Sequence, residues 1–489
     1  MRLLILLSVF ITAALALALR PHQQLAFTKP LDDLFATDWH LFRHLGGYSP
    51  WIPHIHHKGS QDNTIKDGEL PETCTVEQVH MLSRHAERFP TVSVGLKMKQ
   101  LVRRMRDEAG PEIFPFLDRW ELFFDVDEAT GKSRQLEQLT VSGKYAGVDR
   151  ARLAGEKLRG IYGHLIEQQD SNTSATSIFS CSCDRVVDTA DQFATGFFGN
   201  DTSFNHVIVP DRDASRGGDT LTPVKACTRY REDALAGRPN SNTMADLYKL
   251  SYLTPTAERL RQIYKSFEFS VSELWTMQEL CGFDILATGN EDSPWCALFT
   301  KREWEQFEYA RDLLHYYRTG PGTPYSEVMG YIYLNATSQL LREGPEKVGK
   351  IFLSFAHDGD LVPLITTLGL FEQHTPLPTT HAVDDRAWRL SSVVPMGGRI
   401  VFERVSCTSS SSSSSSSEQT GVRLLVNDAV TTIPGCHSST SGICPLSDFL
   451  ALVEAKGAAV GKFEDVCGLG TGLGRRPSFL HHGGVLERE

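Results

Sequence analysis

The sequence predicts an α/β fold, with a central mixed or parallel sheet flanked by helices and a mainly helical inserted domain. Three short β-type runs, at 76–83, 178–183 and 351–356, each lead directly into charged residues. Between the second and third runs, apolar residues recur instead at helical spacing. Ligands bind at the carboxyl ends of strands in open α/β sheets, so the polar residues after these runs are candidates for one shared site.

A length of 489 residues exceeds what one compact core usually uses, so more than one domain is expected. The predicted segments are a signal peptide at 1–18, an extended N-terminal arm at 19–72, a first α/β part with some inserted helices at 73–210, a mainly helical insertion at 211–345, and a second α/β part at 346–489 with a serine-rich loop at 409–417. The histidines of the arm (His54, His56 and His57) lack carboxylate or cysteine partners, so no chemistry is assigned to them.

Several helices and one hairpin can be placed inside these segments. A helix after the second run is indicated by apolar residues at 186, 190, 193 and 197, and Thr300 with Glu303 forms a capping box that begins another. Further helices are expected at 244–260 and 326–343. Nine consecutive serines separate strand-like segments at 399–405 and 422–426, which predicts a β-hairpin with a flexible loop.

The overall charge argues against a polyanion partner held by bulk electrostatics. There are 49 Lys and Arg against 60 Asp and Glu, and the net charge is -11. No basic surface of the kind that grips nucleic acid is therefore expected. An anionic substrate would need a local pocket of arginine or lysine.

The first residues predict export. A charged start, an almost wholly apolar stretch from Leu3 to Leu15, and Ala16-Leu17-Ala18 have the form of a signal peptide. No later apolar run of 18 residues follows and the C-terminus lacks a lipid-anchor tail, so no membrane contact is expected after signal removal. We expect a secreted protein, in the medium, the cell wall space or a vacuole. Three sequons, at Asn172, Asn200 and Asn335, are compatible with glycosylation.

Ten cysteines fit a disulfide framework, although the sequence leaves its connectivity open. The short-range candidates are Cys281 with Cys296 and Cys436 with Cys444. Cys181-Ser182-Cys183 has no second paired cluster at ligand spacing, so a zinc site is the weaker interpretation, and neither a metal nor a cofactor is expected. The oligomeric state is left open.

The run Arg84-His85-Ala86-Glu87-Arg88-Phe89-Pro90 carries the chemistry. Two guanidinium groups flanking an imidazole can clamp phosphate oxygens while a ring nitrogen faces phosphorus. Phosphoryl transfer needs this positioning and charge neutralisation more than anything else. Pro90 is expected to start a helix whose N-terminal amides favour the anion. Arg185 and His357-Asp358 follow the other two strand-like runs and complete a convergent site.

These residues resemble the histidine acid phosphatases, specifically the fungal secreted branch that includes acid phosphatases and phytases. The resemblance covers most of the chain from about Cys74 to Cys467. The segments that carry it, besides the run at 84–90, are Cys74-Thr75-Val76, Arg185 to Ala190, Phe197-Phe198-Gly199, Asn335-Ala336-Thr337, Phe355-Ala356-His357-Asp358, Pro395 to Gly398 and Leu425 to Asp428.

The resemblance implies a phosphoglycerate mutase-like sheet and the hydrolysis of small phosphate monoesters through a phosphohistidine. His85 would be the nucleophile and Asp358 the proton donor. The phosphate-binding residues would be Arg84, Arg88, Arg185 and His357. Arginine charges disfavour imidazolium, so we expect His85 to stay neutral below its ordinary pKa of ~6.5, while acidity keeps more of Asp358 protonated.

Two residues depart from the family pattern. Ala86 stands where the family usually has glycine, which would cost about 1 kcal/mol if the position needs a positive φ. Phe89 replaces a more usual tyrosine. Glu87 is expected either to tune the pocket or to face solvent.

Three other functions are considered besides a broad acid phosphatase. A dedicated phytase would surround the site with extra cations, for which Lys97, Lys99, Arg103 and Arg104 are the candidates unless they form a helix's solvated face. A non-catalytic secreted protein of the same fold is the alternative from another class, and a mutase is disfavoured by export. The P-loop-like run at 344–350 and the glycine-rich run at 468–474 lack the strand and helix context of nucleotide sites.

Overall fold

The computed structural model describes residues 39–52, 64–65, 68–127, 130–167, 176–199, 204–213, 216–408 and 418–469. The predicted signal peptide, most of the N-terminal arm with His54, His56 and His57, the sequons at Asn172 and Asn200, and the serine-rich loop lie outside these residues. So do most residues of the terminal glycine-rich run. Asn335 is described and lies half-buried on a helix.

One mixed sheet forms the centre of the molecule. Its strands are β1 (Cys74–Arg84), β2 (Thr176–Cys181), β3 (Phe204–Val209), β4 (Ile351–Ala356), β5 (Arg399–Thr408), β6 (Glu418–Val426), β7 (Ala429–Thr431) and β8 (Ile443–Pro445). The order is β3-β2-β4-β1-β5-β6-β7, and β8 pairs with β6. Strands β3, β2, β4 and β1 are parallel neighbours, whereas β5 runs antiparallel to β1 and β6 antiparallel to β5. The predicted mixed sheet and the predicted hairpin strands are therefore confirmed.

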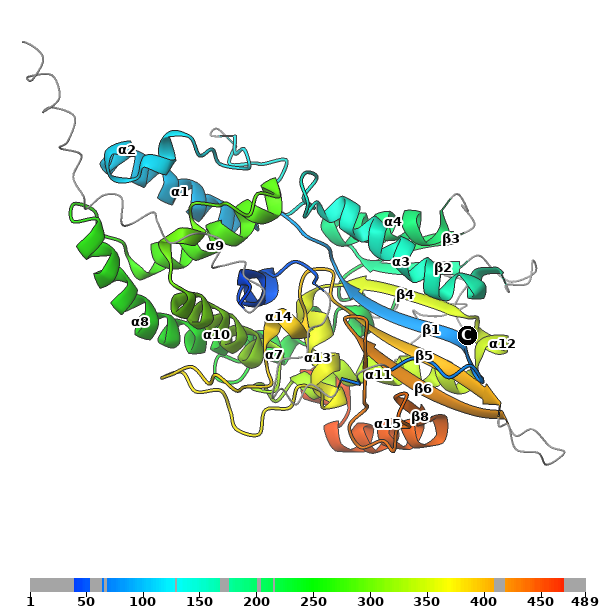
Figure 1. Cartoon of the computed structure of the whole chain (residues 1–489). Coiled ribbons are helices and arrows are strands. Elements are labelled where there is room, and N and C mark those ends of the chain that lie inside the picture. Colours follow the sequence, from blue (N-terminus) through cyan, green and yellow to red (C-terminus); the bar gives the residue numbers. More distant parts are fainter. Residues whose placement is uncertain are drawn as a thin grey trace, which may run out of the picture.

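Helices cover both faces of the sheet (Figure 1). Helices α3 (Gly147–Glu167) and α4 (Asp184–Phe198) pack together on one face, and α11 (Ser326–Glu343), α13 (Asp358–Leu368) and α15 (Leu446–Val460) lie on the other. In α4, the predicted apolar face at 186, 190, 193 and 197 is buried. Strands β2 and β4 are buried along their whole length, as expected for parallel strands covered on both sides.

A second group of helices stands beside the sheet (Figure 1). Its members are α1 (Val92–Glu108), α2 (Gly110–Ile113), α8 (Arg238–Ile263), α9 (Val271–Thr288) and α10 (Lys301–Arg318). The predicted capping box of α10 is present: Glu303 donates its backbone N–H to Thr300 Oγ1 at 3.3 Å, and the Thr300 N–H donates to Glu303 Oε2 at 2.8 Å. Described residues between 211 and 345 contain helices and no strand, while the domain boundaries stay a prediction.

The remaining helices are short. They are α5 (Gly218–Leu221), α6 (Pro223–Ala226), α7 (Thr228–Glu232), α12 (Pro345–Val348), α14 (Leu390–Val393), α16 (Phe463–Cys467) and the 3₁₀ turns Leu41–Arg43, Gly46–Tyr48, Pro115–Asp118 and Cys296–Leu298. Strand β4 follows α12 directly, so the 344–350 run has a strand where a P-loop needs a helix. Among the described helices none is long and apolar enough to cross a membrane.

Four disulfides tie the fold together. Both short-range candidates, Cys281 with Cys296 and Cys436 with Cys444, are formed. Cys74–Cys407 joins the first and fifth strands across 333 residues, and Cys227–Cys467 joins α16 to the residue before α7 across 240 residues. Cys181 and Cys183 are left unpaired.

Candidate functional site

The parallel pairing of β1, β4 and β2 brings three strand ends together. Arg84 is in register with Ala356, and Ser180 with Phe355. The residues that follow each strand must therefore project from one edge of the sheet. The rings of His85 and His357 lie 5.7 Å apart, and Asp358 lies 3.0 Å from Arg84. The structure thus brings the predicted site residues of β1 and β4 into one pocket.

Arg84 is the most deeply held of the predicted site residues. Its side chain is 1% exposed, and one terminal nitrogen donates to the carbonyls of Gly47 at 2.6 Å and Val394 at 2.7 Å. The other terminal nitrogen pairs with Asp358 Oδ2 at 3.0 Å. Burial lowers the pKa of Arg84, while Asp358 opposes that shift. The guanidinium is fixed in one orientation by groups from three distant parts of the chain.

His85 presents one ring nitrogen for chemistry. Nδ1 lies 2.9 Å from the carbonyl oxygen of Ala86, and because a carbonyl only accepts, this bond requires the proton on Nδ1. Nε2 then carries the lone pair. Burial, followed by the charges of Arg84, Arg185 and Arg88, holds the pKa of His85 well below its ordinary value. The expectation of a neutral imidazole agrees with this direction.

Arg88 and Arg185 supply positive charge that no carboxylate of the described residues pairs with. Arg88 donates to the Phe89 carbonyl at 2.8 Å and lies over the Phe283 ring. Burial and the nearby charge of Arg185 lower the pKa of Arg88 to about 10. Arg185 is the second residue of α4, so the helix N-terminus adds its dipole to the same pocket. These cations concentrate positive charge around His85 at this edge of the sheet.

Asp358 is the first residue of α13 and contacts residues of α13 and α10. Its Oδ1 accepts the Gly359 N–H at 2.8 Å, and its Oδ2 lies 3.4 Å from Nε2 of His315, a residue of α10. Burial disfavours the charged carboxylate, but Arg84 and His315 outweigh burial and hold the pKa of Asp358 well below its usual range. This direction runs against the expectation that acidity keeps more of Asp358 protonated, because the arginine at 3.0 Å stabilises the ionised form.

His315 was not expected from the sequence. Burial lowers its pKa to about 4 although Asp358 acts in the opposite direction. It is 3% exposed and lies inside a long amphipathic helix, where a histidine looks like ordinary core. Because burial keeps His315 mostly neutral, Arg84 is the permanent positive charge beside Asp358 that favours its ionised form.

The structure shows how the remaining motif residues, Ala86, Glu87 and Pro90, are placed. Ala86 is buried without a positive φ, so the strain feared at that position is absent; its N–H donates to Thr189 Oγ1 at 3.1 Å. Glu87 is also buried and does not face solvent: it accepts the Trp51 N–H at 3.2 Å and pairs with Arg150 at 3.4 Å. The expected helix begins only at Val92, so Pro90 precedes it instead of starting it.

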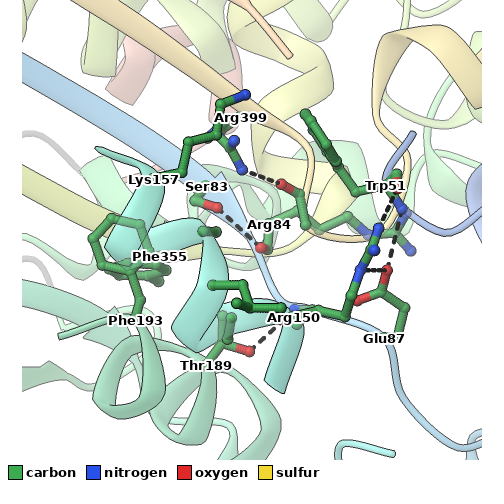
Figure 2. A pocket seen from close by; sticks show the side chains of 15 residues that line it. Trp51, Ser83, Arg84, Glu87, Arg150, Lys157, Thr189, Phe193, Phe355 and Arg399 are labelled. Atoms are coloured by element: carbon green, nitrogen blue, oxygen red, sulfur yellow. Dashed lines mark hydrogen bonds and ion pairs between the residues drawn. The ribbon is translucent and has the colours of Figure 1, made fainter. Parts of the chain in front are cut away.

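A cavity of about 170 Å³ adjoins the motif (Figure 2). Figure 2 shows Arg84, Glu87 and Arg150 on its wall, together with apolar rings of Phe193 and Phe355. His85, Arg88, Arg185, His357 and Asp358 do not line it. Its cations Arg150, Lys157 and Arg399 are paired with Glu87 or Asp428. This cavity is therefore a separate space beside the predicted site residues, with which it shares Arg84.

The cations considered as extra phosphate contacts of a phytase have other partners or lie in solvent, away from the predicted site residues. Arg103 pairs with Asp107 on the exposed side of α1, and Arg104 pairs with Glu108 and Glu273. Lys99 donates to the Val126 carbonyl at 3.2 Å, and Lys97 is exposed. They form the solvated face of a helix, which was the alternative interpretation.

Comparisons with known proteins identify the family of this chain. Residues 75–427 match the family model of the histidine phosphatase superfamily, branch 2. The chain belongs to this family. An acid phosphatase of Komagataella pastoris is 31% identical over 435 residues, covering 87% of this chain and 86% of that protein. A phytase of Candida albicans is 30% identical and covers 86% of this chain and 85% of that protein.

Solved structures agree with this membership. The phytase from D. castellii superposes with a TM-score of 0.75 at 28% identity, covering 89% of both chains. A multiple inositol polyphosphate phosphatase of Bifidobacterium longum shares the fold, with a TM-score of 0.56 at 13% identity. The predicted family, the α/β fold and the class of phosphoric monoester hydrolases are confirmed. The roles of individual residues stay predictions.

The state of His85 can be measured directly. Histidine-selective ¹⁵N NMR should show, at pH 5, a neutral His85 ring with a protonated Nδ1 and a bare Nε2, because burial and arginine charges depress its pKa. The His85→Gln spectrum identifies the signal. Inorganic phosphate should raise the pKa by offsetting the arginine charges. An imidazolium at pH 5 or the opposite tautomer would contradict this account.

Proposed function

We propose that this chain hydrolyses phosphate monoesters in two steps, with His85 Nε2 as the nucleophile that takes the phosphoryl group. The observation that carries the proposal is the free Nε2 of His85 beside Arg88 and Arg185, whose charges no described carboxylate neutralises. A phosphoryl group supplies the missing negative charge. Its oxygens would be bound by Arg84, Arg88, Arg185 and His357.

In the first step the Nε2–P bond forms as the bond from phosphorus to the ester oxygen breaks. Asp358 gives the leaving oxygen a proton. The second ionisation of a phosphate monoester has a pKa of about 6, so at acid pH the substrate enters with a proton of its own. A bound phosphate competes for Arg84 and raises the pKa of Asp358, which lets the carboxylate take up that proton.

In the second step water attacks phosphorus and the P–N bond breaks. Asp358, now ionised, accepts a proton from the water, and phosphate is released. Acid preference then follows from two effects: the substrate delivers the proton at low pH, and His85 stays neutral because its pKa is depressed. Activity should fall at higher pH as the substrate loses its second proton.

The covalent intermediate is the test of this mechanism. Rapid acid quench with ³²P-labelled p-nitrophenyl phosphate should trap one acid-labile label per active chain, and His85→Ala should trap none. Asp358→Asn should still be labelled, because p-nitrophenolate leaves without a proton, yet it should lose its label at least ~100-fold more slowly since the base for water is gone.

Two outcomes would count against the mechanism. A folded wild-type chain that binds phosphate but never becomes labelled would be the non-catalytic protein of the same fold. Label that survives in His85→Ala would place the nucleophile elsewhere. Circular dichroism of both variants controls for folding.

A substrate with several phosphates, such as inositol hexakisphosphate, is the second candidate, and Arg318 favours it. This residue lies at the end of α10, donates to Ser241 Oγ at 3.4 Å and Asn242 Oδ1 at 3.2 Å, and pairs with no described carboxylate. Burial and Arg238 lower the pKa of Arg318, while Asp358 acts in the opposite direction, so Arg318 lies within electrostatic reach of the proton donor. A leaving group with a second phosphate would meet this cation.

Replacement of Arg318 separates the two substrate classes. Arg318→Gln should lower kcat/KM for inositol hexakisphosphate about tenfold, the usual effect of one lost charged hydrogen bond, and change that for phenyl phosphate less than about twofold. Arg103→Gln, at an exposed cation on α1, is the matched control and should change neither. Equal losses on both substrates would contradict a role in recognising the leaving group.

We also propose that the chain is exported. The four disulfides support this, because such bonds persist in oxidising compartments. When the full chain is expressed in a secretory host, the protein recovered from the medium should begin close to residue 19. Retention inside the cell with Met1 still present would contradict export.

A further inference from the structure

Two unpaired cysteines lie beside the phosphate pocket. Eight of the ten cysteines form disulfides, and Cys181 and Cys183 remain. Cys181 ends β2, and Cys183 directly precedes α4. The Cys181 sulfur lies 3.6 Å from Nε2 of His357, and the ligand atoms of Cys181, Cys183 and His357 all lie within 4.8 Å of one another. Within the described residues this is the one group of three such side chains that could hold a metal ion.

The sheet sets this arrangement. Strands β2 and β4 are parallel and in register up to Ser180 and Phe355, so Cys181 and His357 follow at the same edge. Cys181 is buried and Cys183 is half-buried, so the cluster is held in place and also reached from the surface. Two sulfur ligands and one imidazole suit a thiophilic divalent ion such as Zn²⁺, which often keeps a fourth position for water or an anion.

The charged neighbours of the cluster are compatible with a bound cation. Lys225 Nζ lies 3.6 Å from the Cys183 sulfur and would be displaced by a metal, but it keeps an ion pair with Asp211 at 2.5 Å. Arg185 lies close enough to affect the charge of His357 and opposes a cation. Asp360 Oδ2 accepts the His357 backbone N–H at 3.3 Å on the same turn.

We propose that Cys181, Cys183 and His357 form a binding site for Zn²⁺ and similar thiophilic cations, and that binding there inhibits the enzyme. Two thiol protons leave to solvent while bonds form from two sulfurs and one nitrogen to the metal, so no oxidant or reductant is needed. Inhibition follows because His357 cannot bind metal through Nε2 and phosphate through the same atom. Metal binding is independent of the proposed function, whereas inhibition rests on it.

Cadmium and zinc report binding directly. Metal-stripped protein that is unfolded in denaturant without reductant should show two titratable thiols per chain. The metal titrations are made at pH 7, because the ligands must lose protons to bind a metal. Cd²⁺ should then produce a thiolate-to-metal ultraviolet band that saturates at one equivalent, and equilibrium dialysis should retain one Zn²⁺. The Cys181→Ser/Cys183→Ser double variant should show no band. Ser182→Ala, which changes the exposed residue between the cysteines, should titrate like wild type.

Activity gives a second, separable measurement. Zn²⁺ should inhibit phosphatase turnover of wild type and Ser182→Ala by at least about tenfold, each compared with the same protein without metal, and EDTA should restore it. The double variant should keep its own activity in zinc. Should the double variant not fold, Cys183→Ser alone should lose the band.

Each remaining outcome decides the matter. Two titrating thiols without a cadmium band, or no titrating thiols because the pair is oxidised, would overturn the site. A band without inhibition would overturn the link to His357 but leave the site. A chain with no phosphatase activity under any condition would end the proposed function, while the cadmium band would still establish or refute the metal site.

Discussion

The site depends on one ion pair, between the buried Arg84 and the half-buried Asp358. Arg84 is 1% exposed and is oriented by the carbonyls of Gly47 and Val394, which come from residues far from it in the sequence. Carbonyls orient a guanidinium without neutralising it, so its charge remains available. That charge favours both the ionised form of Asp358 and the neutral form of His85. Burial and the charges of Arg185 and Arg88 act on His85 in the same direction, and His315 acts with Arg84 on Asp358.

An excess of buried positive charge has a cost that the fold must bear. Mutual repulsion and burial lower the pKa of Arg88 to about 10, and no described carboxylate compensates. Cys74–Cys407 ties the start of β1 to β5, and β1 ends in Arg84. Glu87 and Arg150 fix the residues that follow. An anion that enters relieves the repulsion, so binding of substrate and stability of the site are linked.

Local sequence could predict the strand ends and the residues they carry, because each signal spans only a few residues. Strand β4 and the capping box of α10 illustrate this. It could not predict contacts whose partners are far apart in the sequence, such as Arg84 with Val394, 310 residues away, or Trp51 with Glu87, 36 residues away. His315 was missed because a histidine on an apolar helix face gives no signal until Asp358 lies beside it. Whether the position of Ala86 has a positive φ could not be predicted either, because backbone φ depends on tertiary context.

The two halves of the site are supplied by different layers, which separates chemistry from substrate choice. The sheet edge provides His85, Arg185 and His357, the residues proposed to bind the phosphoryl group. Helix α10 provides His315 beside Asp358, and Arg318 within the electrostatic reach of Asp358. A change in α10 can thus alter which alcohols leave without disturbing the nucleophile. Cys181, which ends β2, and Cys183, which precedes α4, lie next to His357, so a ligand there would act on the proposed phosphate binding for every substrate alike.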